Sequence, residues 1–181
     1  MGGMLLATVA SMKKTTHLRS GVIVGGSIFM DDSEWKSMLF AWPVINFLGT
    51  VPANLFQKAF SPFSSRINNF WDRLFFCKDN VDPEAARKLF WKNWGPILTL
   101  LLNQLRSAFE AEGMKSHDES VTYADHLSSV EIPVLAIAGT VDKQVSPNSV
   151  EKMAVKIPGS KFFCVGKEHG QQQDYGEFGF I

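Results

Sequence analysis

Three short apolar runs separated by helical patterns constrain the fold of this 181-residue chain more than any other feature. The runs cover residues 20–29, 130–139 and 161–165, and residues 1–14 predict a helix before the first of them. Strands that alternate with helices predict a parallel sheet with right-handed crossovers. The Val-Ile-Val run at 22–24 has no polar residue in alternation, which predicts a strand covered on both faces of the sheet.

The segment from residue 30 to residue 128 has a different composition. It holds all five tryptophans and most of the fifteen phenylalanines, and its prolines divide it into short helices. Asp82 predicts the N-cap of one helix, and an apolar stripe over residues 96–112 predicts another. Ser146, which is followed by a proline, predicts the start of a helix between the last two strands.

Composition excludes several classes of function. Eighteen basic residues balance eighteen acidic ones, so the chain has no net positive charge that would attract nucleic acid. Cys77 and Cys164 predict neither a disulfide framework nor a zinc site. His17, His117 and His126 show no metal-ligand spacing, and no apolar run is long enough to span a membrane.

The segment from Ile132 to Pro147 reads I-P-V-L-A-I-A-G-T-V-D-K-Q-V-S-P. It resembles the late strand of the α/β-hydrolase fold, which carries the acid of a Ser-His-Asp triad. In that family an I-P-V-L strand ends in G-x-x-D, and a short loop with a proline leads into a helix. The resemblance places Asp142 at the acid position, where it would orient a histidine. An aspartate that only caps its own loop is the alternative.

The first seven residues, M-G-G-M-L-L-A, resemble the second half of a nucleophile elbow of the form G-H-S-M-G-G-x-L-L. In such proteins the serine directly precedes this methionine. The backbone N–H of Met1 would then match an oxyanion-hole donor, although at a free N-terminus it is an ammonium group. We therefore expect that the sequence begins inside a longer hydrolase or is a shortened version of one.

The last eight residues, D-Y-G-E-F-G-F-I, resemble the late family motif D-Y-G-H-F-D-L-I, which supplies the catalytic histidine. Glu177 stands at the histidine position, and Gly179 stands where the family has an acidic residue. A glutamate, with an ordinary pKa of about 4.3, is a poor proton shuttle at neutral pH. His169 is the alternative base, and an exposed loop histidine is the simpler interpretation of it.

The fold class that we expect is α/β: the C-terminal part of an α/β-hydrolase, with about three parallel strands and flanking helices, plus a helical cap insert. Residues 1–29 would begin the hydrolase core after the nucleophile. Residues 30–128 would form the cap, and residues 129–181 the C-terminal core with the acid strand, a helix, the last strand and the late loop. The insert is similar to caps of plant and bacterial hydrolases of lipase and esterase type.

The resemblance implies hydrolysis of a carboxylester of a hydrophobic acyl group, by a serine triad that needs no cofactor. For these residues alone we expect a degenerate, inactive form, a pseudoenzyme. The alternative is a non-catalytic module that binds a hydrophobic ligand or another protein. The aromatic insert fits a cap core, the lining of an acyl pocket or a peripheral membrane contact. A soluble intracellular protein is the simplest expectation, with a plastid location as an option for the full-length parent, and the oligomeric state stays open.

Overall fold

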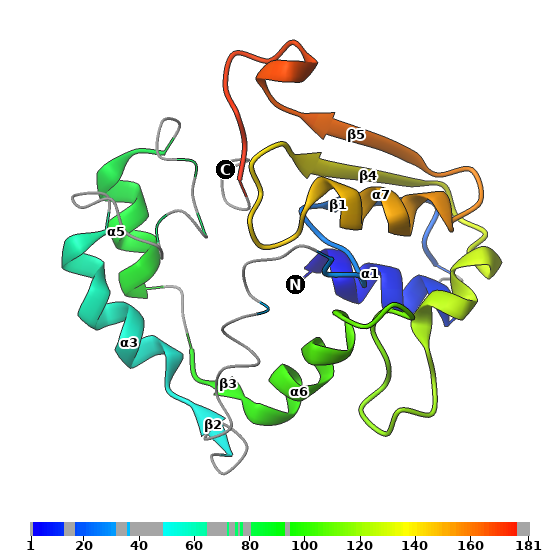
Figure 1. Cartoon of the computed structure of the whole chain (residues 1–181), viewed down its shortest axis with the longest axis horizontal. Coiled ribbons are helices and arrows are strands. Elements are labelled where there is room, and N and C mark those ends of the chain that lie inside the picture. The colour runs from blue at the N-terminus through cyan, green and yellow to red at the C-terminus, as the bar shows by residue number, and fades with distance from the viewer. Residues whose placement is uncertain are drawn as a thin grey trace.

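A three-stranded parallel sheet forms the centre of the computed structural model, with the strand order β1-β4-β5 (Figure 1). The strands are β1 (Gly21–Val24), β4 (Val134–Gly139) and β5 (Lys161–Val165). The number of strands and their parallel direction confirm the sequence prediction. The structure describes residues 2–12, 17–31, 36, 49–64, 72, 75, 77, 81–92 and 95–176.

Two helices, α1 (Gly2–Ser11) and α7 (Pro147–Val155), cover one face of this sheet. Helix α1 contacts β1, and α7 contacts β4 and β5. Buried residues of both helices join a single apolar core with the sheet residues that point the same way. The main core residues from these elements are Met4, Ala7, Ala10, Ile23, Ala136, Ala138, Val150, Met153 and Ala154. The hydrophobic effect of burying this face holds the three strands and two helices together.

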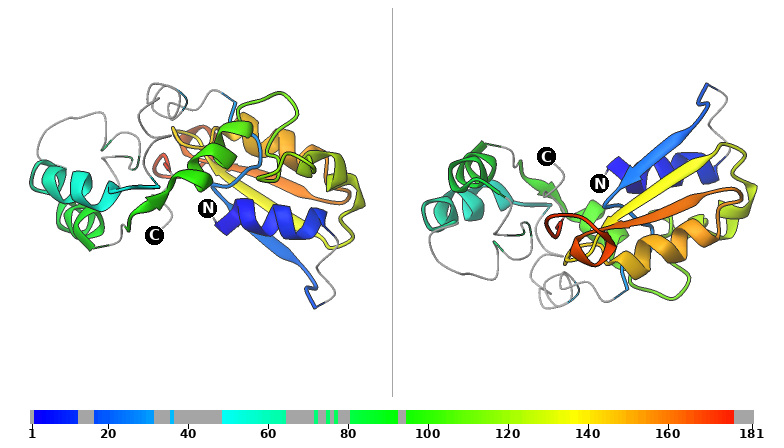
Figure 2. Two further views of the ribbon diagram at one scale, coloured as in Figure 1. Left: turned by 90° about the horizontal axis from the view of Figure 1, so that it is seen from below. Right: turned by 90° about the horizontal axis from the view of Figure 1, so that it is seen from above.

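The opposite face of the sheet is open over β1 and β5, in the part of the chain that the structure describes. Val22 and Val24 are 57% and 44% exposed, and Phe163 of β5 is 58% exposed. The register pairs Val24 with Ile137 and Ile137 with Phe163, so these side chains share one face. In the right view of Figure 2 the strands lie in front of α1.

The prediction of a strand over residues 20–29 covered on both faces is therefore wrong. Strand β1 has only four residues, and they alternate between buried and exposed. The following residues leave the sheet because Gly25 has a φ of 57° and turns the chain away. The strand also lies at an edge of the described sheet, because only β4 pairs with it.

Between β1 and β4 the chain forms short elements that lie mostly to one side of the sheet (Figure 1). They are β2 (Thr50–Val51), α3 (Ala53–Phe60), η2 (Ser61–Phe63), α5 (Pro83–Lys92), β3 (Ile97–Leu98) and α6 (Thr99–Ser107). A further short helix, η4 (Tyr123–Ser129), contacts α1 before the chain enters β4. The Asp82 carboxylate accepts hydrogen bonds from the backbone N–H groups of Glu84 (2.9 Å) and Ala85 (2.8 Å), which confirms the predicted N-cap of α5.

The helix predicted over residues 96–112 is shorter in the structure. Ile97 and Leu98 instead form β3, which pairs antiparallel with β2, and helix α6 ends at Ser107. A non-local strand pairing thus overrides the local apolar stripe. Leu105 and Phe109 pack both against the small cluster of Val51 with Leu102 and against the main core.

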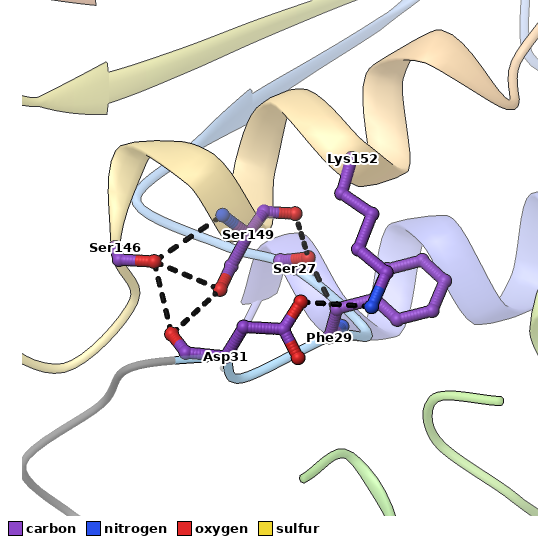
Figure 3. Close-up of polar contacts among 6 residues, drawn as sticks. All are labelled: Ser27, Phe29, Asp31, Ser146, Ser149 and Lys152. Atoms are coloured by element: carbon purple, nitrogen blue, oxygen red, sulfur yellow. Dashed lines mark hydrogen bonds and ion pairs between the residues drawn. The ribbon is translucent and has the colours of Figure 1, made fainter. Parts of the chain in front are cut away.

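A polar cluster fastens the segment after β1 to the start of α7 (Figure 3). The Ser27 hydroxyl donates to the Ser149 carbonyl at 2.7 Å and accepts the Phe29 N–H at 3.0 Å. The hydroxyls of Ser146 and Ser149 both donate to the Asp31 carbonyl at 3.0 Å. Ser146 also accepts the Ser149 N–H, which confirms it as the N-cap of α7.

Replacing Ser27 with alanine is expected to lower the free energy of unfolding by about 2 kcal/mol. The side chain is fully buried, so the Phe29 N–H would lose this acceptor where no water can replace it. Urea unfolding followed by circular dichroism measures the change. Ser128→Ala is the matched control, because Ser128 is exposed and should change stability by less than about 0.5 kcal/mol. Equal effects of the two substitutions would contradict this account.

Candidate functional site

The candidate site lies at the end of the sheet where the parallel strands finish. Carboxyl ends of parallel strands share one edge, and this is where such sheets usually place their functional residues. The start of α1 also reaches this edge, because a Cβ on Gly26 would lie 2.9 Å from the Gly3 Cα. Glycine at these two positions allows the helix to approach the end of β1 closely. The elements from β2 to α5, which lie between β1 and β4 in the sequence, extend from this side of the sheet (Figure 1).

Asp142 lies at this edge in the acid loop, which we define as residues 140–146 between β4 and α7. Its side chain is 4% exposed. The Oδ1 atom accepts hydrogen bonds from the backbone N–H groups of Gln144 at 2.8 Å and Val145 at 3.0 Å. Hydrogen bonds from backbone N–H groups favour the ionised form of a carboxylate. The loop therefore fixes a buried carboxylate directly after the central strand.

A second loop, the C-terminal loop (residues 170–176), lies against the acid loop. The Val141 N–H donates to the Tyr175 carbonyl at 3.2 Å. The Asp174 Oδ1 atom accepts the Thr140 hydroxyl at 3.0 Å and the Lys167 N–H at 2.9 Å. These bonds hold the pKa of Asp174 below its ordinary value, with the Lys167 N–H as the largest cause and the Thr140 hydroxyl next.

The sequence analysis identified Asp142 but missed Thr140 and Asp174 as the contact between the two loops. The signal that could have revealed them is a glycine at the end of each strand, Gly139 and Gly166. A Cβ on Gly139 would lie 2.1 Å from the Tyr175 carbonyl oxygen, and one on Gly166 would lie 2.0 Å from the Thr140 hydroxyl. Glycine at a strand end often marks such a close approach of another chain segment.

The other sequence-predicted residues are not brought together with Asp142 in the described part of the chain. Met1 and Glu177 lie outside the described residues. His169 is exposed on the short helix η5 (Lys167–His169), and its side chain makes no hydrogen bond to a described residue. Cys77 and Cys164 are half-buried free thiols.

Within the described residues, no group of three or more histidine, cysteine, aspartate or glutamate side chains could hold a metal ion. No helix among these residues is long and apolar enough to cross a membrane. What the site does supply is a fixed, buried carboxylate next to a loop that is held in a defined place. Such a carboxylate can orient an imidazole and stabilise its protonated form.

Comparison with solved structures identifies the architecture, whereas no protein-family model and no curated protein matches the sequence. An esterase from Thermogutta terrifontis aligns over 97% of this chain and 54% of its own, with a TM-score of 0.50 and 17% identity. An esterase from Exiguobacterium antarcticum aligns over 97% of this chain and 57% of its own, with a TM-score of 0.52 and 13% identity. A bromoperoxidase from Bacillus anthracis aligns over 91% and 56%, with a TM-score of 0.51 and 18% identity. The chain thus spans about half the length of the structures that it matches.

Proposed function

Because the chain has the α/β-hydrolase fold over about half the length of the matched structures, we propose that its parent activity is hydrolysis of a carboxylester. The acyl group would be hydrophobic, and the chemistry would be that of a Ser-His-Asp triad. Asp142 would be the acid. The observation that carries this proposal is the buried Asp142 carboxylate at the end of β4, held by two backbone N–H groups.

In this role Asp142 acts on a histidine and never touches the substrate. The carboxylate accepts the imidazole Nδ1–H, which selects the tautomer whose Nε2 takes the proton of the serine. It then stabilises the imidazolium that forms as the serine oxygen attacks the ester carbonyl. The imidazolium returns its proton to the leaving alcohol, and a water molecule then releases the acyl group from the serine by the same two proton transfers. Burial strengthens this electrostatic effect, because little water screens the carboxylate.

We further propose that residues 1–181 by themselves do not turn over esters. The sequence has Glu177 at the family histidine position and no G-x-S-x-G elbow. The one serine that follows a glycine pair at the end of β1 is Ser27, and its hydroxyl is buried and donates to the Ser149 carbonyl. A hydroxyl engaged in this way cannot reach a substrate. The chain would then be a non-catalytic member of the fold.

The test is hydrolysis of p-nitrophenyl acetate and octanoate by the purified 181-residue chain, with circular dichroism and a thermal melt on the same sample. We expect a folded chain whose rate equals that of buffer. Turnover that Asp142→Asn abolishes would contradict the inactivity proposal. In any longer form of the protein that hydrolyses these esters, Asp142→Asn is expected to lower kcat by about 10⁴-fold. The matched control is Asp125→Asn, because Asp125 is exposed and lies outside the site.

Binding of a hydrophobic ligand or partner is a second candidate, and exposed apolar side chains on the insert favour it. These are Leu55, Phe60, Phe63, Trp91, Leu98 and Leu100. They come from α3, η2, α5, β3 and α6, and exposed apolar side chains grouped on one part of a protein often mark a binding surface. Saturable binding of a fluorescent medium-chain fatty acid by the same folded, inactive sample would support this second function.

A further inference from the structure

Helices α3 and α5 and the short helix η2 pack into one unit of the insert. The two helices contact each other, and η2 contacts both of them. The Ser61 hydroxyl of η2 donates to the Arg87 carbonyl of α5 at 3.1 Å, and Ala86 of α5 is buried. The helices lie side by side at the end of the molecule away from the sheet (Figure 1, Figure 2). The unit therefore has an inner side that is held by packing and an outer side with exposed side chains.

The outer side combines apolar and basic side chains from both helices. On α5, Trp91 and Lys92 follow Lys88 by three and four positions, so the three residues share one face of the helix. On α3, Leu55 and Lys58 share a face for the same reason. The Lys58 Nζ atom lies 5.8 Å from the centroid of the Trp91 ring, which joins the two helix faces into one surface. We call this surface the α3–α5 face, and it consists of Leu55, Lys58, Lys88, Trp91 and Lys92.

The side chains of the α3–α5 face project from the protein. Leu55 is 62% exposed and Trp91 is 52% exposed, and all three lysines of the face are exposed. Phe63 of η2, the short helix that contacts both α3 and α5, is 53% exposed. Sites for small molecules are concave and enclose most of the ligand. Side chains that are more than half exposed on two adjacent helices fit an extended partner surface better than a small ligand.

The distribution of charge indicates the chemistry of that partner. The chain as a whole is neutral, with eighteen basic and eighteen acidic residues. Within α3, η2 and α5, however, there are four basic residues and only one acidic residue, Glu84. This glutamate pairs with Lys88 at 2.8 Å. Positive charge is thus concentrated beside the exposed Trp91 ring, where it attracts an anionic surface.

Lysine beside tryptophan distinguishes a lipid surface from a protein partner. Lysine is depleted at protein–protein interfaces, whereas both types of partner favour tryptophan. At a bilayer surface the apolar stem of a lysine lies along the acyl boundary while its ammonium group reaches the lipid phosphates, and a tryptophan ring lies at the same level. The α3–α5 face has three lysines around Trp91 and Leu55, which is the composition of a lipid-binding surface.

We propose that the α3–α5 face binds the surface of a bilayer that contains anionic lipids. Trp91 and Leu55 enter the headgroup region, and the Lys58 ammonium group contacts lipid phosphates. This membrane role rests on the binding function proposed above, which it makes specific, and does not depend on Asp142. The contact is confined to one face of two helices, so it anchors the protein to the bilayer surface without crossing it.

Co-sedimentation of the full 181-residue chain with lipid vesicles tests the membrane role. Vesicles of phosphatidylcholine mixed with phosphatidylserine are compared with vesicles of phosphatidylcholine alone. We expect binding to the mixed vesicles and several-fold weaker binding to phosphatidylcholine alone. The difference should disappear at high salt, because salt screens the attraction between lysines and anionic lipids. A chain that does not sediment with the mixed vesicles at low salt would overturn the proposal.

Two substitutions on the α3–α5 face have matched controls on strand β5. Trp91→Ala is expected to weaken binding to the mixed vesicles about tenfold, and Lys58→Gln is expected to weaken it about fivefold. Phe163→Ala removes a similarly exposed ring and Lys161→Gln removes an exposed lysine, and both should leave binding unchanged. Equal losses in the variants and in their controls would overturn the assignment of binding to this face.

A charge-reversed variant covers the case in which Trp91→Ala does not fold. Lys58→Glu combined with Lys92→Glu changes two exposed side chains and keeps every apolar residue of the face. We expect this variant to bind the mixed vesicles no better than vesicles of phosphatidylcholine alone, because the anionic lipids now repel it. A preference for phosphatidylserine that survives the charge reversal would overturn the proposal.

The fatty-acid assay described above separates the membrane role from the second candidate function. Fatty-acid binding without vesicle binding would overturn the membrane role and keep the ligand function. Vesicle binding that depends on Trp91 supports the membrane role whether or not the fatty acid binds. Light scattering without vesicles tests a third occupant. Self-association that Trp91→Ala abolishes, in a chain that does not bind vesicles, would assign the α3–α5 face to a second copy and overturn the proposal.

Discussion

Replacing Phe29 with alanine is expected to lower the free energy of unfolding by about 3–5 kcal/mol, the largest effect that we foresee for a single substitution. The side chain is fully buried, with 0% exposure. The surrounding atoms are held in place and cannot collapse into the space that the ring leaves. A Cβ on Gly113 would lie 2.6 Å from the ring, and the Gly113 φ of 83° fixes that turn against it.

Two lysine side chains also lie near the Phe29 ring. The Lys152 Nζ atom lies 4.4 Å from the ring centroid and also pairs with the Asp31 carboxylate at 2.8 Å. Lys156 lies farther away, at 5.9 Å from the centroid. The alanine variant would lose the favourable contact of these cations with the ring as well as the buried apolar area.

The matched control is Phe163→Ala on β5, which removes the same ring from the open face of the sheet. Phe163 is more than half exposed, so its loss should cost less than about 1 kcal/mol. Urea unfolding followed by far-ultraviolet circular dichroism measures both variants. Similar losses at the two positions would mean that the open face is covered in solution, and that the core around Phe29 is not the main source of stability.

Local signals predicted the parts of the fold that depend on neighbouring residues. Asp82 and Ser146 cap the helices that follow them, because an N-cap needs only a side-chain oxygen and the next three backbone N–H groups. The alternation of strands and helices predicted the parallel sheet for a similar reason, since a crossover connection leaves few alternatives. The residues that determine these features lie within a few positions of the features themselves.

Non-local features were not predictable in the same way. The Val-Ile-Val run of β1 indicates that these residues favour a strand. Whether each face of that strand is buried depends on helices and loops that are far away in the sequence. Val22 and Val24 are therefore exposed although their sequence is that of a buried strand. The pairing of Ile97 and Leu98 with β2 is likewise set by residues more than forty positions earlier.

The candidate site shows the same division. The resemblance of one strand and loop pointed to Asp142, and the structure places it buried at the end of β4. The bond from Thr140 to Asp174 links residues 34 positions apart, and neither residue type is unusual where it stands. Only the folded arrangement of β4 and β5 reveals that they meet.

Replacing Gly139 with alanine is expected to lower the free energy of unfolding by about 3 kcal/mol and to move the C-terminal loop away from the acid loop. The new Cβ would lie 2.1 Å from the Tyr175 carbonyl oxygen and 2.7 Å from its carbon. These are backbone atoms, so no rotation of a side chain can relieve the clash. Either the loop separates or strand β4 shifts, and both outcomes break the bond from Val141 to Tyr175.

Urea unfolding and amide exchange at Val141 distinguish these outcomes from a general loss of stability. Exchange at Val141 should rise far more than exchange in the helix α7, because the clash acts on the loop contact first. Gly95→Ala is the control, since a Cβ there meets no atom of the described residues within 4 Å and its φ lies outside the left-handed region. It should change stability by less than about 0.5 kcal/mol. A Gly139→Ala chain as stable as this control, with protected Val141, would show that the C-terminal loop does not pack against β4.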